Sequence, residues 1–114
     1  MEERSFDGAA PISPGRFFEL SSDMLCLIGT DGFFKAVNTA WCQTLGYTEA
    51  DLLSRPYLGF VHPDDRDMTA AEATRIADGI GTLHFRNRYR CSDGTYRWLA
   101  WRTTPAFEDG TIYA

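Results

Sequence analysis

Two runs of alternating apolar and polar residues flank Asp93 and Gly94 near the C-terminal end of the chain. Alternation with a period of two predicts a β-strand that buries one of its faces. An Asp-Gly pair is typical of a two-residue turn between antiparallel strands, so residues 83–103 are predicted to form a hairpin. The inward set is predicted to be Leu83, Phe85, Asn87, Tyr89, Leu99, Trp101 and Thr103, and the outward set His84, Arg86, Arg88, Arg90, Tyr96, Trp98, Ala100 and Arg102.

Three further strands are predicted from shorter patterns. Residues 24–30 and 33–37 form a second pair joined by an Asp31-Gly32 turn, with Lys35 pointing outward and Phe34 and Ala36 pointing inward. An Asp-Gly turn at 109–110 opens a last strand at residues 111–114.

Short helices are predicted between these strands. Residues 16–20 are predicted to form one of them. Asn38 is a good N-cap for a helix that runs to Leu45, and Gly46 stands where a left-handed C-cap is needed. Thr48 opens another helix in a capping-box arrangement with Asp51.

A longer helix is predicted over residues 63–78. Pro63 suits its first turn, the acidic residues after it suit the positive end of the helix dipole, and Gly79 suits its end. The predicted apolar spacing on this helix begins at Met68 and reaches Ile76. Strands, helices and strands in this order predict an α+β fold, with helices on one face of an antiparallel sheet.

Composition narrows the class of protein. The chain has 114 residues, enough for one domain, and we interpret residues 1–15 as a flexible leader and residues 16–114 as a single domain. The formal charge of −5 argues against nucleic acid or an anionic membrane as partner. The chain shows no secretory signal and no membrane-spanning run, and its 3 cysteines include no Cys-x-x-Cys pair, so a cytoplasmic location is expected.

Catalytic and metal chemistry have little support in the sequence. His62 and His84 have no obvious nucleophile and base around them, so no enzymatic activity is predicted; a small enzyme using His62 with Asp64 or Asp65 is a remote alternative. The carboxylates that follow His62 should fan around a helix axis instead of converging on a metal ion. The arginines at 86, 88, 90 and 97 are interpreted as a solvated sheet face in preference to an anion site.

Several motifs occur together in a characteristic order. The chain contains "TDGFFKAVN", then "HPDD", then an Asp-Gly turn followed by Tyr-Arg-Trp. In this order and spacing they resemble the PAS sensor family, over residues 17–114. The resemblance implies a five-stranded antiparallel sheet with several short helices and one longer helix packed on one face. It also implies a longer last strand than the one here, so the domain is expected to be incomplete at its final strand.

The resemblance implies a ligand site between the inner face of the sheet and the helices. The residues predicted to contact a ligand there are Cys26, Ile28, Trp41, Cys42, Phe85, Asn87, Tyr89, Leu99 and Trp101. We interpret most of this set as core, and an inward amide at Asn87 needs hydrogen-bond partners from either a ligand or its neighbours. Large inward rings fill the volume that a sizeable ligand would need, so any ligand there would have to be small or flat.

No cofactor is predicted, and the residues match neither of two family cofactors. Flavin-binding relatives carry an Asn-Cys-Arg-Phe motif before the long helix, where this chain reads "YLGFVHPDD", and ring-binding asparagines at the positions of Tyr89 and Leu99. Haem-binding relatives carry a histidine within the long helix, and residues 63–78 contain none.

The resemblance also implies a place in a larger signalling protein. The chain is expected to be a sensory input domain of, for example, a histidine kinase or a cyclic-dinucleotide enzyme, followed by an effector domain. A homodimer through Phe17, Phe18, Tyr96 and Trp98 is predicted, because these rings would otherwise remain exposed. The alternative is a ligand-free interaction and dimerisation module with the same fold.

Overall fold

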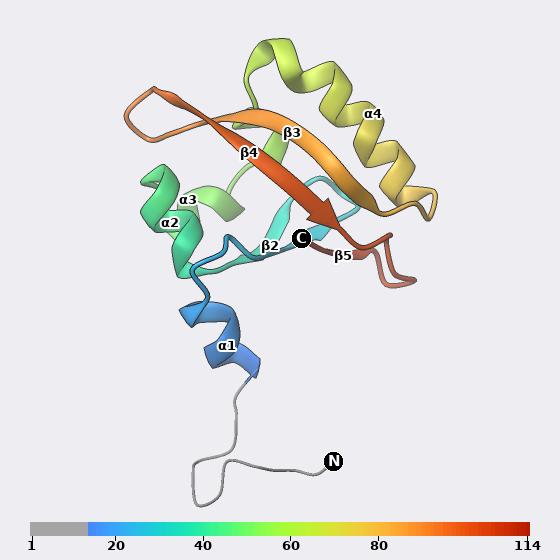
Figure 1. The fold of residues 1–114 in the computed structure, drawn as a ribbon, viewed down its shortest axis with the longest axis horizontal. Coiled ribbons are helices and arrows are strands. Elements are labelled where there is room, and N and C mark those ends of the chain that lie inside the picture. The colour runs from blue at the N-terminus through green and yellow to red at the C-terminus, as the bar shows by residue number, and fades with distance from the viewer. Residues whose placement is uncertain (1–13) are drawn as a thin grey trace, which may run out of the picture.

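The computed structural model describes residues 14–114 (Figure 1). Within this range the strands are β1 (Cys26–Gly29), β2 (Phe34–Val37), β3 (Thr82–Arg90), β4 (Tyr96–Thr103) and β5 (Thr111–Tyr113). The helices are α1 (Pro14–Leu20), α2 (Thr39–Leu45), α3 (Glu49–Leu53) and α4 (Arg66–Ala77), with 3-10 turns at η1 (Tyr57–Gly59) and η2 (Pro63–Asp65). The predicted α+β fold with five antiparallel strands and a short last strand is therefore confirmed.

The strands pair as two antiparallel ladders, one ordered β2-β1-β5 and the other formed by β3 and β4. The ladders meet where β4 ends, since the amide of Thr104 donates to the carbonyl oxygen of Tyr113 at 2.9 Å. The sequence predicts one continuous sheet; here β5 is only 3 residues long and its partners lie in β1.

The β3–β4 hairpin differs from its prediction in two details. Its loop holds three residues, Ser92 to Gly94, and is closed by the amide of Cys91 donating to Thr95; Gly94 takes a positive φ of 91°. A register shift between Thr82 and Phe85 also changes the alternation. Leu83 is therefore 67% exposed, although the sequence places it inward, and Thr82 is buried instead.

The helix ends follow local sequence signals closely. Gly46 caps α2 with φ 88°, and Thr48 and Asp51 exchange both hydrogen bonds of a capping box at α3. Asn38 precedes α2 as predicted, but its side chain makes no capping bond. It instead accepts from the amide of Leu25 at 3.0 Å and donates to the carbonyls of Phe18 and Asp23.

The first helix, α1, does not cover the outer face of the hairpin. α1 includes Pro14 and Gly15, which the sequence assigns to the leader; the remaining leader residues, 1–13, lie outside the described range. The helix projects away from the hairpin beside α2 (Figure 1). Phe17 and Leu20 are 63% and 76% exposed because none of the described elements packs over them.

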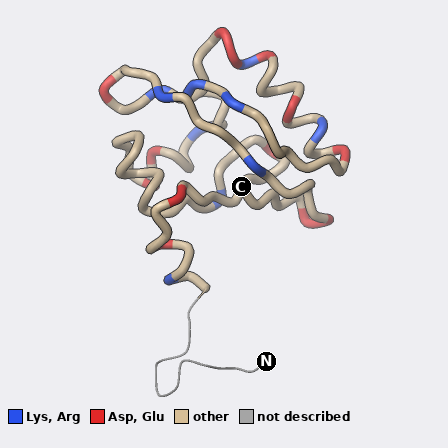
Figure 2. The backbone as a smooth tube through the Cα atoms, in the orientation of Figure 1, with Lys and Arg blue, Asp and Glu red and all other residues tan. Residues whose placement is uncertain are grey.

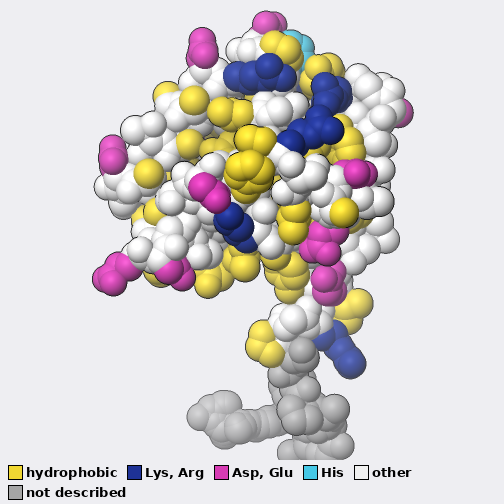
Figure 3. Space-filling view, turned by 180° about the vertical axis from the view of Figure 1, so that it is seen from behind, with side chains coloured by type: hydrophobic (Ala, Val, Ile, Leu, Met, Phe, Trp, Pro, Cys, Tyr) yellow, Lys and Arg dark blue, Asp and Glu magenta, His cyan; other side chains and the backbone are white. Residues whose placement is uncertain are grey.

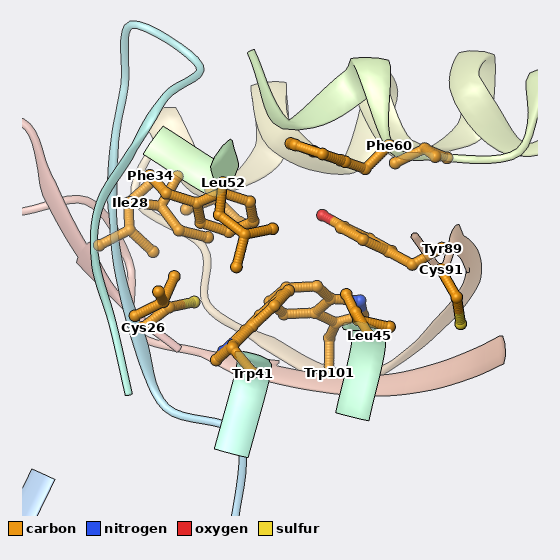
Figure 4. Packing of buried hydrophobic residues seen from close by; sticks show 14 residues of the cluster. Cys26, Ile28, Phe34, Trp41, Leu45, Leu52, Phe60, Tyr89, Cys91 and Trp101 are labelled. Carbon is orange, nitrogen blue, oxygen red and sulfur yellow. The ribbon is translucent and has the colours of Figure 1, made fainter. Parts of the chain in front are cut away.

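The core lies between the two ladders and the helices (Figure 4). Trp41 from α2 is 1% exposed, and its ring centroid lies 4.9 Å from that of Phe34, 5.7 Å from Tyr89 and 5.6 Å from Trp101. Edge-on and tilted ring pairs at these distances add to the free energy gained from area burial. Trp41 therefore packs α2 against both ladders.

Candidate functional site

A small pocket of about 50 Å³ lies between the inner face of the hairpin and α4. It is lined by Ile28, Tyr57, Thr69, Glu72, Ala73, Ile76, Thr82, Phe85, Asn87, Tyr89, Trp101 and Thr103. A buried water needs roughly 10–15 Å³ of such space, so the volume suits a few waters or a molecule of a few heavy atoms.

The Asn87 side chain lies at this pocket and is 1% exposed. Its carbonyl oxygen accepts the indole N–H of Trp101 at 2.8 Å, and its Nδ2 donates to Oγ1 of Thr69 at 3.1 Å. The inward direction predicted for Asn87 is confirmed. The side-chain amide of Asn87 is therefore satisfied by neighbouring side chains, one of the two types of partner expected from the sequence, the other being a ligand.

The phenol of Tyr89 also lines the pocket, and its hydroxyl has hydrogen-bonding capacity that the described residues do not use. Tyr89 is 1% exposed, and within residues 14–114 its recorded neighbours are rings and apolar side chains, with no hydrogen bond to its oxygen. Figure 4 shows its hydroxyl pointing into the middle of the cluster, toward the side of Leu52 and Phe34. Burial raises the pKa of Tyr89, so the phenol stays protonated and can donate a hydrogen bond.

The nine residues predicted to contact a ligand separate into two groups. Ile28, Phe85, Asn87, Tyr89 and Trp101 line the pocket. The others, Cys26, Trp41, Cys42 and Leu99, do not line it. Cys26 is buried and Cys42 half-buried, and burial raises the pKa of both thiols, which disfavours the reactive thiolate.

Sequence reasoning anticipated Ile76 of α4 at the pocket but missed Thr69 and Ala73. Thr69, Ala73 and Ile76 line it at helical spacing, whereas the predicted apolar face begins one residue earlier, at Met68. Met68 is 43% exposed, so that part of the prediction is wrong. Helical spacing counted from Thr69 would have predicted the correct inward face. A threonine can be buried there because its hydroxyl donates to the backbone carbonyl of Asp65 at 2.7 Å.

A wider groove separates the hairpin from the start of β1 and the end of β5. It measures about 840 Å³ and is lined by Ser22, Asp23, Met24, Leu25, Trp41, Thr44, Leu83, His84, Phe85, Arg86, Trp98, Leu99, Ala100, Trp101, Arg102 and Ala114. The buried Nε1 of Trp41 has no hydrogen-bond partner within the described residues.

Arginines gather on the hairpin, as Figure 2 shows in blue, and hydrophobic side chains lie beside basic ones on the face in Figure 3. Trp98 on the outer face is 56% exposed. The guanidinium carbons of Arg86 and Arg88 lie 5.3 and 5.1 Å from its ring centroid. These are cation–π contacts, which hold the ring in place while leaving its area accessible.

Arg88 is not simply a solvated arginine. Its Nε and Nη2 donate to Oδ2 and Oδ1 of Asp65 at 2.9 and 2.7 Å, and its backbone amide donates to Oδ2 at 2.9 Å. The sequence predicts that Asp65 serves mainly to stabilise the positive end of the helix dipole. In the structure Asp65 is 4% exposed, and its buried carboxylate forms a bidentate pair with Arg88. The guanidinium of Arg88 lowers the pKa of the Asp65 carboxyl.

The contribution of the Asp65–Arg88 pair to stability should be measurable from the pH dependence of unfolding. Because the folded-state pKa of Asp65 is lowered, the pair stabilises the fold fully above the unfolded-state pKa of about 4 and loses that contribution as pH falls through the folded-state pKa. Asp65→Asn should therefore lower the urea midpoint near pH 7 and weaken its fall on acidification toward pH 3.

The matched control is Asp31→Asn, which removes an exposed pair with Lys35 and should change both quantities less. Parallel midpoint-versus-pH curves for wild type and Asp65→Asn would contradict the assignment.

His62 has a structural role at the start of η2. Its Nδ1 accepts the amide N–H of Asp64 at 3.0 Å, and its ring lies 4.6 Å from that of Tyr96. Within residues 14–114, no group of three or more His, Cys, Asp or Glu side chains is placed to hold a metal ion. In the same range, no helix is long and apolar enough to cross a membrane.

Comparison with known proteins identifies the class of protein. Residues 34–114 match the profile of the family described as PAS fold, and the chain belongs to that family. A probable diguanylate cyclase, DgcE of Escherichia coli (strain K12), is 28% identical over 81 residues, which cover 70% of this chain. The match spans 7% of that protein's length.

Solved structures confirm the fold. A domain of a sensory box sensor histidine kinase/response regulator from Geobacter sulfurreducens has a TM-score of 0.76 at 23% identity, covering 87% of this chain and 85% of its own. The PAS domain of an HTR-like protein from Haloarcula marismortui has a TM-score of 0.70 at 23% identity, covering 85% of each chain. The PAS-B domain of Drosophila melanogaster Cycle, with bound ethylene glycol, has a TM-score of 0.63 at 16% identity, covering 81% and 96%.

Proposed function

We propose that this chain is the sensory input domain of a larger signalling protein and has no catalytic activity of its own. A small polar molecule would bind in the pocket between β3 and α4 and shift the packing of the hairpin. The observation that carries the proposal is this pocket of about 50 Å³ itself, whose lining includes Asn87, Trp101 and Tyr89, the last with no hydrogen bond to its phenol oxygen among the described residues.

The pocket restricts the ligand by size and by chemistry. A volume of about 50 Å³ suits a molecule of a few heavy atoms with one or two oxygen or nitrogen groups. Ethylene glycol, bound by the PAS-B domain of Cycle, is of this size and offers a probe for this chain. Of the predicted ligand contacts, Asn87, Tyr89 and Trp101 would form the polar and aromatic wall, with Ile28 and Phe85 beside them.

The similarity to sensor kinases and to a probable diguanylate cyclase supports an effector of one of these kinds in the full protein. The domain would act in the cytoplasm. Dimerisation would place the effector domains of two chains together. Trp98 and Tyr96 on the hairpin are 56% and 41% exposed, and Phe17 on α1 is 63% exposed, so these rings are available for contact with a second chain. Phe18 is half-buried and would lie at the edge of such a contact.

A ligand-free interaction module with the same fold is the second candidate. The satisfied amide of Asn87 and the small pocket favour it, because a closed polar network needs no ligand. The two candidates differ in whether the purified protein retains or binds a small molecule.

Native mass spectrometry of the purified protein beside its denatured spectrum, followed by ethylene glycol titration monitored by ¹⁵N–¹H NMR, tests the proposal. A mass lost on denaturation, or saturable shifts at the side-chain N–H groups of Asn87 and Trp101, would support sensing. A bare chain of 12.8 kDa or its dimer, without saturable shifts, would reject the pocket as a site and leave the interaction module.

Asn87→Leu is expected to lower the free energy of unfolding by about 1–3 kcal/mol, because it leaves the indole N–H of Trp101 buried without an acceptor. Urea unfolding measures this change. If the pocket binds a ligand, the same variant should lose the retained mass or the glycol shifts. Thr74→Val is the matched control, since Thr74 lies on α4 but is exposed. Unchanged stability in Asn87→Leu would contradict the observed hydrogen bonding.

A further inference from the structure

A series of contacts connects the pocket to the outer face of the hairpin through hydrogen bonds on both sides of Asp65, one to its backbone carbonyl and others to its carboxylate. It begins at the indole of Trp101, passes through the amide of Asn87 and reaches Oγ1 of Thr69. The hydroxyl of Thr69 donates to the backbone carbonyl of Asp65 at 2.7 Å. The carboxylate of Asp65 then holds the guanidinium of Arg88 in a bidentate pair.

The last member of the series is the exposed ring of Trp98. The guanidinium carbon of Arg88 lies 5.1 Å from the ring centroid, and Trp98 is directly opposite Arg88 in the antiparallel register. One arginine therefore contacts a buried carboxylate and an exposed aromatic ring at the same time. Its position depends on Asp65, which is fixed by the start of α4.

The geometry makes these contacts sensitive to one another. A planar guanidinium with two short bonds to a carboxylate has its plane fixed by that carboxylate, and stacking on an indole requires a particular plane. Asp65 is 4% exposed, whereas the side chain of Arg88 is 29% exposed, so the buried carboxylate sets the position of the guanidinium. A shift of the first turn of α4 would therefore move the Arg88 guanidinium relative to the Trp98 ring.

We propose that the Asp65–Arg88 pair couples the pocket to the outer sheet face, so that a change at Thr69 or Asn87 alters how the arginine packs on Trp98. This inference rests on the proposed function for its biological purpose, since the pocket supplies the input and Trp98 the output. The coupling itself is a property of the chain and needs no ligand to be measured.

The test uses substitutions within the pocket as the perturbation and ¹⁵N–¹H NMR of the whole chain as the readout. Thr69→Val removes the hydroxyl that connects Asn87 to Asp65 with little change of volume. We expect it to shift the indole signal of Trp98, identified from its absence in Trp98→Phe, and the Nε–H signal of Arg88. In the Asp65→Asn background the same substitution should leave the Trp98 signal in place.

Two controls separate coupling from a general structural change. Thr74→Val removes the same type of bond, from a threonine hydroxyl to the carbonyl of Ala70 at 3.2 Å, on the exposed side of the same helix, and should not move the Trp98 signal. Asp31→Asn removes a surface ion pair with Lys35 and should leave the response of Trp98 to Thr69→Val intact.

If Asp65→Asn fails to fold, Arg88→Lys replaces it, because lysine keeps the charge but lacks the fork that pairs with the carboxylate and stacks on the ring. An unchanged Trp98 signal in Thr69→Val, or an equal shift with the pair disrupted, would overturn the coupling. A positive result in a protein that binds no small molecule would retain the coupling and reject the ligand, so the two proposals fail separately.

Discussion

Trp41→Ala is expected to lower the free energy of unfolding by about 3–5 kcal/mol, the usual range for removing a buried aromatic side chain. Trp41 is 1% exposed and contacts the rings of Phe34, Tyr89 and Trp101, so its loss opens a cavity between α2 and both ladders. A small domain has a total stability of about 5–15 kcal/mol, so the variant should be marginally folded. Urea unfolding followed by circular dichroism measures the change.

Trp98→Ala is the matched control for this substitution. Trp98 is 56% exposed and its contacts are two arginines on the surface of the hairpin, so its loss should cost less than about 1 kcal/mol. Equal destabilisation by both substitutions would show that Trp41 does not join the two ladders as the structure indicates.

Asn38→Ala is expected to lower the free energy of unfolding by about 2–4 kcal/mol, because three hydrogen bonds are lost and the amide of Leu25 loses its acceptor. The Asn38 side chain is buried at 0% exposure and ties the carbonyls of Phe18 and Asp23 to the start of α2. The change should also increase amide hydrogen exchange at Ser21 and Leu25, which mass spectrometry or NMR can follow.

Two other variants sharpen the assignment of Asn38. Asn38→Asp keeps the acceptor for Leu25 but places a carboxylate oxygen against two carbonyls, so it should destabilise almost as much. Thr39→Ala removes only an exposed bond to Glu19 and should have a small effect. If Asn38→Ala behaves like Thr39→Ala, the buried amide does not anchor α1 and the segment before β1.

Local signals in the sequence were sufficient for much of the fold. The capping box of Thr48 and Asp51 and the left-handed Gly46 are confirmed because each depends on residues within a few positions of one another. The inward direction of Asn87 is confirmed because strand alternation is also local. The resemblance to the PAS family added the arrangement of these elements.

The candidate site was only partly predictable. Phe85, Asn87 and Tyr89 line the pocket as the alternation along their strand predicts. Thr69 and Ala73 lie on α4, where the predicted apolar face began at Met68, one residue too early. The register shift that exposes Leu83 was also missed, because the pairing of β3 with β4 sets it and no residue signals it locally.

The sequence by itself determined the order of the elements, several of the caps and turns between them, the α+β class and the strand faces along most of the hairpin. Only the tertiary structure decided which partners the buried polar groups have. Asp65 and Arg88 lie 23 positions apart, and Asn87 and Thr69 lie 18 apart, so neither pair has a periodic signature. Short-range conformational preferences fix the elements, whereas the contacts that position the pocket and its connection to Trp98 depend on how those elements pack.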